Sequence, residues 1–364
     1  MENMAEHVSR RIRIRQLPKS TNPATVTVVI SCYNYGRFLP QAVQSCLEQK
    51  GVGVDVIIVD DASTDTSLAV AKTLAKTNAN VSVLAHSRNK GIVDTFNDGA
   101  KAATGEFLVR LDADDLLTPG SLARATLLAQ EFPTVGFVYG HPLHFAADTL
   151  PKARTRASAW TIWPGLEWLT DRCRSGKNVI TSPEVVMRRS VIDEVGYMAP
   201  LRHAHDMELW LRMAAFADVG YIHGADQAWH RDHPDSVSAR EVDGLVDLRE
   251  RLEAFDVLFA GVARSAPGAA ALLVEARRTL VNEALRTARL ELDRGLPHPE
   301  LFDAYLRFAE SIDSSVTAPA HLRSLRGSHV FHGSRLNPWR LARRIEGRAR
   351  SVLSWHRWHR EGVF

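Results

Sequence analysis

The sequence predicts an α/β fold in which a mostly parallel sheet is flanked by helices and followed by a helical C-terminal region. Short β-branched runs alternate with amphipathic segments through the first two thirds of the chain, which is the rhythm of βαβ units. Strand signals then stop near residue 240, and helical spacing takes over. With 364 residues, 45% of them hydrophobic and 24% charged, the chain is long enough for one large α/β domain and an appendage.

Five apolar runs have the length and the β-branched content of strands. They are TVTVVIS (25–31), VDVIIVD (54–60), VSVLAH (81–86), EFLVRLD (106–112) and VGFVYG (135–140). The segments between them, such as FLPQAVQSCLEQ and TSLAVAKTLAK, carry apolar residues at helical spacing. Strands that are joined by helices pair in parallel, so we expect these runs to form one sheet.

The remaining chain divides by composition. Long helical patterns after residue 240 are broken at SAPG and RGLPHP. We therefore expect a basic N-terminal arm at residues 1–24, the sheet domain at 25–240, a helical region at 241–320 and a basic amphipathic tail at 321–364. The net charge is only +3, but ten arginines lie in residues 322–364, which favours an anionic neighbour for the tail.

Cysteine content and hydropathy exclude several classes of protein. The three cysteines have unrelated spacings that fit neither a disulfide framework nor a metal-binding CxxC pair; they are Cys32, Cys46 and Cys173. No apolar stretch reaches the roughly 18 residues of a membrane span, and the first residues lack the apolar core of a signal peptide. We expect a cytoplasmic protein.

Acidic residues gather where the predicted strands end. The first strand runs into CYNYG, the second into DDASTD and the fourth into DADD, and ligands of parallel sheets bind at this edge. Asp112 and Asp114 flank one residue, so extended backbone places both side chains on the same side. With no basic residue expected beside Asp112, Asp114 and Asp115, a divalent cation would have to offset their repulsion. The alternative is that Asp112 ends a strand and Asp115 caps the next helix.

Several motifs in series resemble the nucleotide-sugar-binding half of the family 2 glycosyltransferases, which are inverting enzymes of the GT-A fold, a Rossmann-like arrangement. The motifs are VVISCYNYGRFLPQAVQSCLEQ, DVIIVDDASTDTS and RNKGIVDTFNDGAKAATGEFLVRLDADD, within roughly residues 25–235. The resemblance implies a nucleotide-diphosphate-sugar donor, UDP by default, and Mn²⁺ or Mg²⁺ held at Asp112 and Asp114 against the diphosphate. Nucleic acid is not expected as a partner.

The resemblance also implies which residues line the donor site. Asp60 or Asp61 would accept from the base or the ribose, Tyr33 would lie near the base, and Asp112 would lie beside the bound nucleotide. Arg88, Asn89 and Gly91 would line the same site, with Gly91 allowing close backbone approach. The structural alternatives are a turn cap for the aspartates, packing for Tyr33 and a solvated charge for Arg88.

The segment HAHDMELWLRMA (203–214) supplies the candidate catalytic base. Family members typically carry an acidic pair before an apolar-aromatic helix, with the second acid as the base. In this chain His205 replaces the first acid, and Asp206 is the predicted base. Its alternative role is to cap the helix that begins here, and one carboxylate can serve both roles.

WHRDHPDSVSA (229–239) resembles the segment that closes over bound donor in this family. His233 is the candidate third metal ligand or diphosphate contact, because an imidazole can join carboxylates at Mn²⁺. His230 and Arg231 are weaker candidates for the same anion.

Two other classes of protein share parts of this pattern. Phosphatases with an aspartate nucleophile use D-x-D-x-T after an early strand, but this chain has Leu116 at the threonine position. A non-catalytic nucleotide-sugar or glycan-binding protein on the same fold would keep the sheet and lose the base. Because Asp206 is present along with Asp112 and Asp114, we expect an enzyme that transfers a sugar to a glycan or lipid-linked hydroxyl, as in bacterial surface polysaccharide or glycoconjugate assembly.

The tail NPWRLARRIEGRARSVLSWHRWHR predicts an amphipathic helix that begins at Asn337 and Pro338. Its apolar residues recur at helical spacing opposite several arginines; they are Ala342, Ile345, Ala349, Val352 and Leu353. The helix either docks on the protein or lies peripherally on an anionic inner membrane surface, with Trp355 and Trp358 at the level of the headgroups.

Overall fold

The computed structural model describes residues 9–14, 22–146, 149–233, 243–293, 299–314 and 338–363. These residues divide into two compact units, one within Met1–Leu169 and Asn178–Ala239 and the other within Thr170–Lys177 and Arg240–Phe364. All the predicted site residues, from Tyr33 to His233, therefore belong to the first unit.

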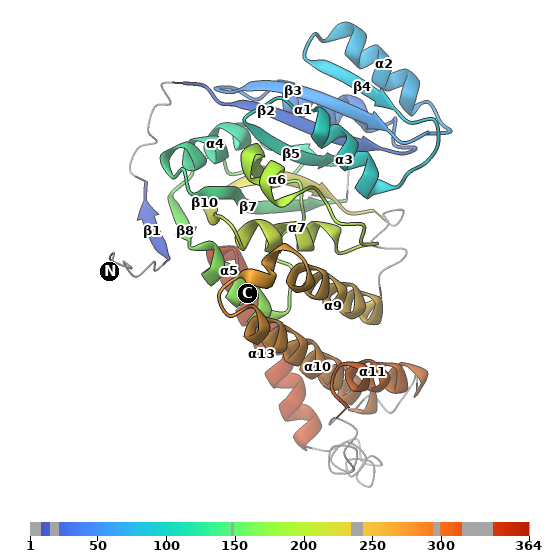
Figure 1. Cartoon of the computed structure of the whole chain (residues 1–364), viewed down its shortest axis with the longest axis vertical. Helices are drawn as coiled ribbons and strands as arrows, with labels where there is room; N and C mark the ends of the chain where they lie inside the picture. Colours follow the sequence, from blue (N-terminus) through green and yellow to red (C-terminus); the bar gives the residue numbers. More distant parts are fainter. Residues whose placement is uncertain are drawn as a thin grey trace. The chain divides into compact units, whose positions relative to one another are not determined.

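Within the described residues, one mixed sheet of ten strands forms the centre of the first unit (Figure 1). Its order is β1-β8-β10-β7-β9-β5-β2-β3-β4, with β6 added on β10. The parallel part contains the five predicted strands and β10; these are β2 (Thr25–Cys32), β3 (Gly53–Asp60), β4 (Val81–Ala85), β5 (Phe107–Asp112), β7 (Val135–Phe145) and β10 (Asp218–Arg231).

Antiparallel strands complete the sheet. They are β1 (Arg10–Arg13), β6 (Leu116–Leu117), β8 (Ala159–Trp163) and β9 (Val186–Arg188). The residues Arg10–Arg13, expected to lie in a basic arm, all pair with β8, opposite Ala159 to Ile162. The three arginines of RRIR hide the strand signal, and charged side chains are what an exposed sheet edge tolerates.

Helices cover both faces of this sheet. The first face packs its Val26, Val28 and Ile30 row into one cluster with α1 (Leu39–Leu47), α2 (Ser67–Thr77) and α4 (Ser121–Glu131). The second face carries α3 (Ile92–Ala102) and α7 (His205–Ala214), whose Trp210 ring lies 5.9 Å from that of Phe137 on β7. Strands buried on both faces explain why the central runs are apolar throughout and do not alternate.

A glycine sets how closely α3 approaches the sheet. A Cβ atom added at Gly99 would lie 2.4 Å from Val29 Cγ1 and 2.9 Å from Val59 Cγ2. Any larger residue would push α3 away from β2 and β3. The loop that precedes α3 is thereby held near the carboxyl ends of those strands.

Strand register brings the acidic residues to one rim. Cys32 pairs with Asp60, and Ser31 pairs with Asp112 on the other side of β2. The last residues of three neighbouring parallel strands therefore lie side by side, as expected for ligand-binding residues of an open sheet.

The second unit is helical in its described residues. Helices α9 (Gly244–Ala260), α10 (Ala269–Asp293) and α11 (Pro299–Ile312) pack against one another. Arg251 on α9 is buried and bridges Asp247 and Glu283, which satisfies its charge inside the helix pair. Asp243 caps α9 by accepting from the backbone N–H groups of Leu245 and Val246.

The tail forms helix α13 (Pro338–Glu361), which begins at the predicted proline, while Asn337 lies outside the described residues. Part of the predicted apolar stripe faces solvent: Ile345 is 60% exposed, Val352 47%, Leu353 69% and the nearby Trp355 54%. Among the helices that the structure describes, none has the length and the apolar character needed to span a bilayer.

Candidate functional site: an acidic rim bridged by a buried arginine

The three aspartates at the end of β5 have different partners. Arg110 donates from Nη2 to both carboxylate oxygens of Asp112, at 2.8 and 3.0 Å, and is almost completely buried. The expectation of carboxylates without a basic partner is therefore wrong for Asp112. Arg110 lies two residues before Asp112 on the same strand, and residues at that spacing project to the same side.

Arg110 also connects β5 to the segment that holds the predicted base. Its Nη1 donates to the Ser182 hydroxyl at 2.9 Å, and this hydroxyl donates to Asp206 Oδ2 at 2.9 Å. Ser182 is 2% exposed and has a φ of 102°, a left-handed conformation that costs free energy for a residue with a side chain. The structure thus brings Asp112 and Asp206 into one hydrogen-bonded network.

Asp206 lies in the first turn of α7, where its Oδ1 accepts from the backbone N–H of Met207 at 2.6 Å. The N-cap of the helix is Ala204, so Asp206 is one of the acids near the helix start and not the cap itself. Burial lowers the pKa of His205, and the Arg110 charge lowers it further. The residue that replaces the family's first acid is therefore a neutral imidazole at pH 7.

Asp114 and His233 form the second polar contact of the rim. His233 Nε2 lies 2.8 Å from Asp114 Oδ2 and 3.3 Å from the Tyr35 hydroxyl. Burial raises the pKa of Asp114 to about 6, and the charges of Asp115 and Asp112 act in the same direction. A cation placed against such a carboxylate would stabilise its ionised form.

The donor set partly fits a divalent cation. Asp114 and His233 offer an oxygen and a nitrogen side by side, and burial together with the neighbouring Asp115 and Asp112 charges raises the pKa of Asp114. Among the described residues, no group of three that includes Asp112 has its ligand atoms within 4.8 Å of one another. Asp112 faces Arg110, so it would reach the same ion only through its remaining lone pairs or a water molecule.

Asp115 has a structural role that differs from the expected cap. Its two oxygens accept from the backbone N–H of Arg231 at 2.9 Å and face His230 Nδ1 at 3.1 Å. The next element is strand β6, and α4 begins only at Ser121. Burial lowers the pKa of His230, but the hydrogen bond and the charge of Asp115 outweigh it and raise that pKa to about 9.

The two aspartates after β3 also differ. Asp61 accepts from the backbone N–H groups of Lys90 and Gly91, at 2.8 and 2.9 Å, and contacts His86 Nδ1 at 2.8 Å. It therefore anchors the loop before α3. Asp60 is 1% exposed; its Oδ2 accepts from Ser63 N at 3.2 Å, whereas its Oδ1 is buried without a hydrogen-bond partner.

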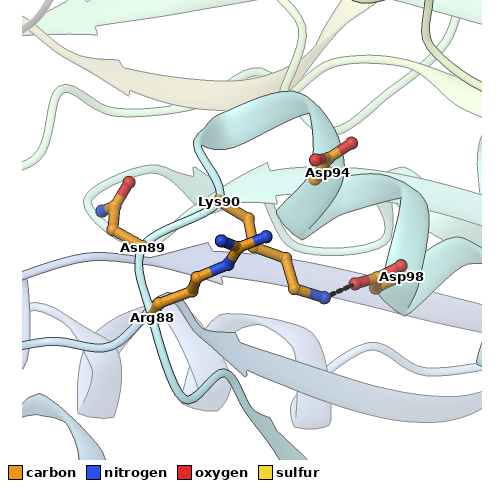
Figure 2. A pocket seen from close by; sticks show the side chains of 5 residues that line it. All are labelled: Arg88, Asn89, Lys90, Asp94 and Asp98. Atoms are coloured by element: carbon orange, nitrogen blue, oxygen red, sulfur yellow. Dashed lines mark hydrogen bonds and ion pairs between the residues drawn. The ribbon is translucent and has the colours of Figure 1, made fainter.

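The loop that Asp61 anchors lines a hollow of about 440 Å³, together with Asp94 and Asp98 of α3. Figure 2 shows Arg88, Asn89 and Lys90 on this loop, with Lys90 reaching Asp98 at 2.7 Å. Asn89 Nδ2 lies 3.4 Å from the Asp61 carbonyl oxygen. Gly91 has a φ of 86° as the N-cap of α3, and an added Cβ would meet no protein atom within 4 Å, so its backbone conformation explains the glycine.

Tyr33 lies on the loop after β2 and is 46% exposed. The neighbouring aromatic residue, Tyr35, makes the contact with His233 and was not singled out from the sequence. Ser182 was also missed, because a left-handed serine in a loop has no sequence signature. Arg110 could have been found from its spacing to Asp112.

A mostly parallel sheet with carboxylates gathered at the ends of its strands is the architecture of the GT-A class. Residues 27–196 match the model of the family described as glycosyl transferase family 2. The identification from motifs is thereby confirmed.

Curated relatives match this chain over part of their length. An uncharacterized glycosyltransferase of Nostoc sp. is 38% identical over 114 residues, which cover 31% of this chain and 35% of that protein. An uncharacterized protein of Mycobacterium tuberculosis is 26% identical over 216 residues, covering 56% and 66%. The succinoglycan biosynthesis protein ExoO of Rhizobium meliloti is 36% identical over 99 residues, covering 27% and 28%. The chain thus spans less than two thirds of each of these relatives.

Two solved structures share the fold. S. aureus TarS 1-349 in complex with UDP-GlcNAc has a TM-score of 0.50 at 15% identity, covering 83% of this chain and 92% of that one. The mannosyltransferase PcManGT from Pyrobaculum calidifontis, in complex with GDP-Man and Mn²⁺, has a TM-score of 0.51 at 17% identity, covering 88% and 83%. The predicted fold class is confirmed, including the helical C-terminal region.

The different partners of Asp60 and Asp61 predict different effects on stability. Asp61→Asn should lower the free energy of unfolding by about 1.5–3 kcal/mol, because one backbone N–H of the loop loses a charged acceptor. Asp60→Asn, the matched control, should change it by less than about 1 kcal/mol, since Oδ1 has no partner to lose. Denaturant unfolding of both variants provides the measurement, and equal losses would contradict the division of roles.

Proposed function

We propose that the protein is an inverting, metal-dependent glycosyltransferase of the hexosyltransferase type. It would move a sugar from a nucleotide-diphosphate sugar to a hydroxyl of a glycan or lipid-linked acceptor. The observation that carries the proposal is the Arg110–Ser182 bridge, which places the predicted base Asp206 in one network with Asp112 of the DxD motif. The match of residues 27–196 to the family model supports the reaction class.

The donor nucleotide would bind at the carboxyl ends of β2 and β3. The unpaired Oδ1 of Asp60 can accept from a base N–H or a ribose hydroxyl, and the exposed Tyr33 offers an aromatic face nearby in the chain. Arg88, Asn89 and Gly91 would complete this side of the site. UDP is the proposed default nucleotide; TarS, which shares the fold, was solved with UDP-GlcNAc, and PcManGT with GDP-Man.

Mn²⁺ or Mg²⁺ would be held by Asp114 and His233, with Asp112 alongside. When bound, the cation would act as a Lewis acid that neutralises the charge of the departing nucleoside diphosphate. The protein's own part is to hold Asp114 at the rim, which Arg231 supports by donating from Nε to the Asp114 carbonyl oxygen at 3.1 Å.

Asp206 would remove the proton from the acceptor hydroxyl. The Ser182 hydroxyl and the backbone of Met207 each donate to one of its oxygens, which fixes the carboxylate and leaves further lone pairs for the acceptor.

Metal dependence can be tested through donor binding. Asp114→Ala should abolish the Mn²⁺-promoted binding of nucleotide sugar while the protein stays folded, because the carboxylate is the proposed ligand. Asp55→Ala, on the exposed side of β3, is the control. A panel of nucleotide sugars with and without Mn²⁺, followed by nucleoside diphosphate release, identifies the donor. Wild-type donor affinity that is unchanged by EDTA would argue against the metal.

The base can be tested separately. Asp206→Asn keeps the shape of the side chain and should leave donor binding close to wild type while lowering sugar transfer by about 10²–10⁴-fold. The two quantities are measured by calorimetry and by transfer to the acceptor that the wild-type protein uses. Transfer at the normal rate would move the base elsewhere, and a wild-type protein that binds donor without transfer would indicate the non-catalytic binding protein.

We also propose that α13 places the protein on the inner surface of the membrane, beside a lipid-linked acceptor. The exposed Ile345, Val352, Leu353 and Trp355 lie on a helix with basic residues in its last turn, which suits an anionic interface. The partial match to ExoO, a succinoglycan biosynthesis protein, supports an acceptor in polysaccharide assembly.

Liposome co-sedimentation tests this location. Full-length protein should sediment with anionic vesicles at low salt and less with neutral ones, and a truncation ending at Gly333 should not sediment. The double variant Leu353→Ser/Trp355→Ser should weaken binding, whereas Val274→Ser, at a 66% exposed apolar residue of α10, should not. If the full-length protein fails to bind anionic vesicles, α13 has no role at the membrane.

A further inference from the structure

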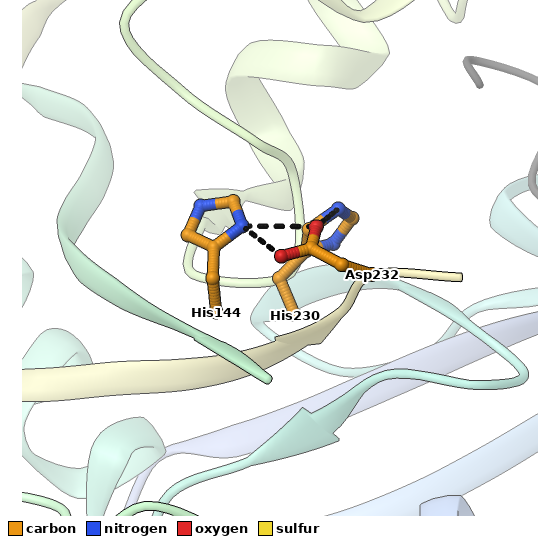
Figure 3. A group of neighbouring side chains, drawn as sticks. All are labelled: His144, His230 and Asp232. Carbon is orange, nitrogen blue, oxygen red and sulfur yellow. Dashed lines mark hydrogen bonds and ion pairs between the residues drawn. The ribbon is translucent and has the colours of Figure 1, made fainter. Parts of the chain in front are cut away.

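Two neighbouring strands place three potential metal ligands on one side of the sheet, outside the donor rim. His144 of β7 and His230 of β10 are register partners in a parallel pair, so their side chains project to the same face. Asp232 follows His230 by two residues, and its backbone N–H donates to the Phe145 carbonyl at 2.8 Å, which continues the pairing. Extended backbone therefore brings Asp232 to the same side as His230. Figure 3 shows the three side chains converging.

The distances within this cluster suit a small divalent ion. His144 Nδ1 lies 3.2 Å from each carboxylate oxygen of Asp232, and His230 Nε2 lies 3.9 Å from Oδ1. Ligand atoms of all three residues lie within 4.8 Å of one another. Bonds of about 2.0–2.1 Å in a tetrahedral zinc site put the ligand atoms about 3.3 Å apart, so only small side-chain movements would be needed.

A second observation comes from behind the cluster. His230 is oriented by Asp115, whose carboxylate is 1% exposed and faces Nδ1 at 3.1 Å. A metal would displace the Nε2 proton of His230, while the Nδ1 proton stays directed at Asp115; the lone pair freed on Nε2 lies on the side of Asp232. A buried carboxylate behind a histidine is the arrangement that orients metal-ligating imidazoles.

We propose that His144, His230 and Asp232 form a binding site for Zn²⁺ or a similar first-row transition metal. Two imidazoles and one carboxylate suit such ions better than Mg²⁺, which prefers oxygen ligands. Three protein ligands leave a fourth position for a water molecule or an anionic oxygen of a bound ligand. The His144 and Asp232 side chains are 43% and 54% exposed, which gives the ion access from solvent.

The site shares no ligand with the Asp114–His233 pair, but it is adjacent to that pair in the chain. Asp232 precedes His233, and Asp115, which orients His230, follows Asp114. An ion held at the cluster would therefore fix the end of β10, from which His233 reaches Asp114.

Zinc binding to the full-length, metal-stripped protein tests the proposal, by calorimetry with Zn²⁺ alone and by the visible absorption of Co²⁺ as a substitute. An Asp114→Ala background removes the other candidate ligand pair, and no nucleotide sugar is present, so the result is independent of the proposed transferase activity. We expect His144→Ala and Asp232→Asn each to weaken Zn²⁺ binding by at least about tenfold, the scale on which even supporting residues of metal sites act. His356→Ala, at an exposed histidine of α13, should have no effect.

Thermal unfolding checks that the variants remain folded, which is expected because the His144 and Asp232 side chains are largely exposed. Zinc affinity that stays unchanged in both His144→Ala and Asp232→Asn would overturn the proposal. So would a protein in the Asp114→Ala background that binds no Zn²⁺.

Discussion

The rim of this sheet depends on the buried guanidinium of Arg110. Its Nη2 donates to both oxygens of Asp112, and its Nη1 donates to Ser182, which in turn donates to Asp206, so two carboxylates from distant parts of the chain belong to one network. Losing such a group would remove the link that these residues have to each other through a guanidinium, and would leave the half-buried Asp112 without its cationic partner. The left-handed backbone of Ser182 is the strain that this geometry imposes, and the bridge is what holds the serine in place.

Much of the sheet could be predicted because its central strands are apolar on both faces. The five expected strands match β2, β3, β4, β5 and β7 closely, although β7 continues to Phe145. Most of the strands that were not predicted are short and antiparallel. The exception is β10, which is long and pairs in parallel with β7 but has breaks of register near Asp226. Charged edge strands and β-bulges interrupt the alternation of apolar and polar residues that indicates a strand. The sequence of β1 therefore predicts an arm and not a strand.

The site was predictable to the extent that it follows from the ends of strands. Asp60, Asp112 and Asp114 lie at the expected rim, and Asp114 meets His233 across more than a hundred residues. The hydrogen-bond partners of these side chains could not be derived in the same way, because they depend on how segments distant in the sequence pack together. Asp61 therefore proved to anchor a loop, and Tyr35, rather than Tyr33, contacts His233. The roles of these residues in catalysis remain predictions.

Side chains at the end of β10 alternate between the two faces of the strand. Arg231 stacks on the Phe38 ring at 4.7 Å and His233 lies 6.2 Å from the same ring, whereas His230 and Asp232 face His144 on the opposite side. Four consecutive residues thus contact two different sets of partners by simple alternation. Inserting or deleting one residue in this stretch would exchange the two sets, while a change of two would preserve them. The order in which side chains alternate between the two faces therefore matters more here than the length of the strand.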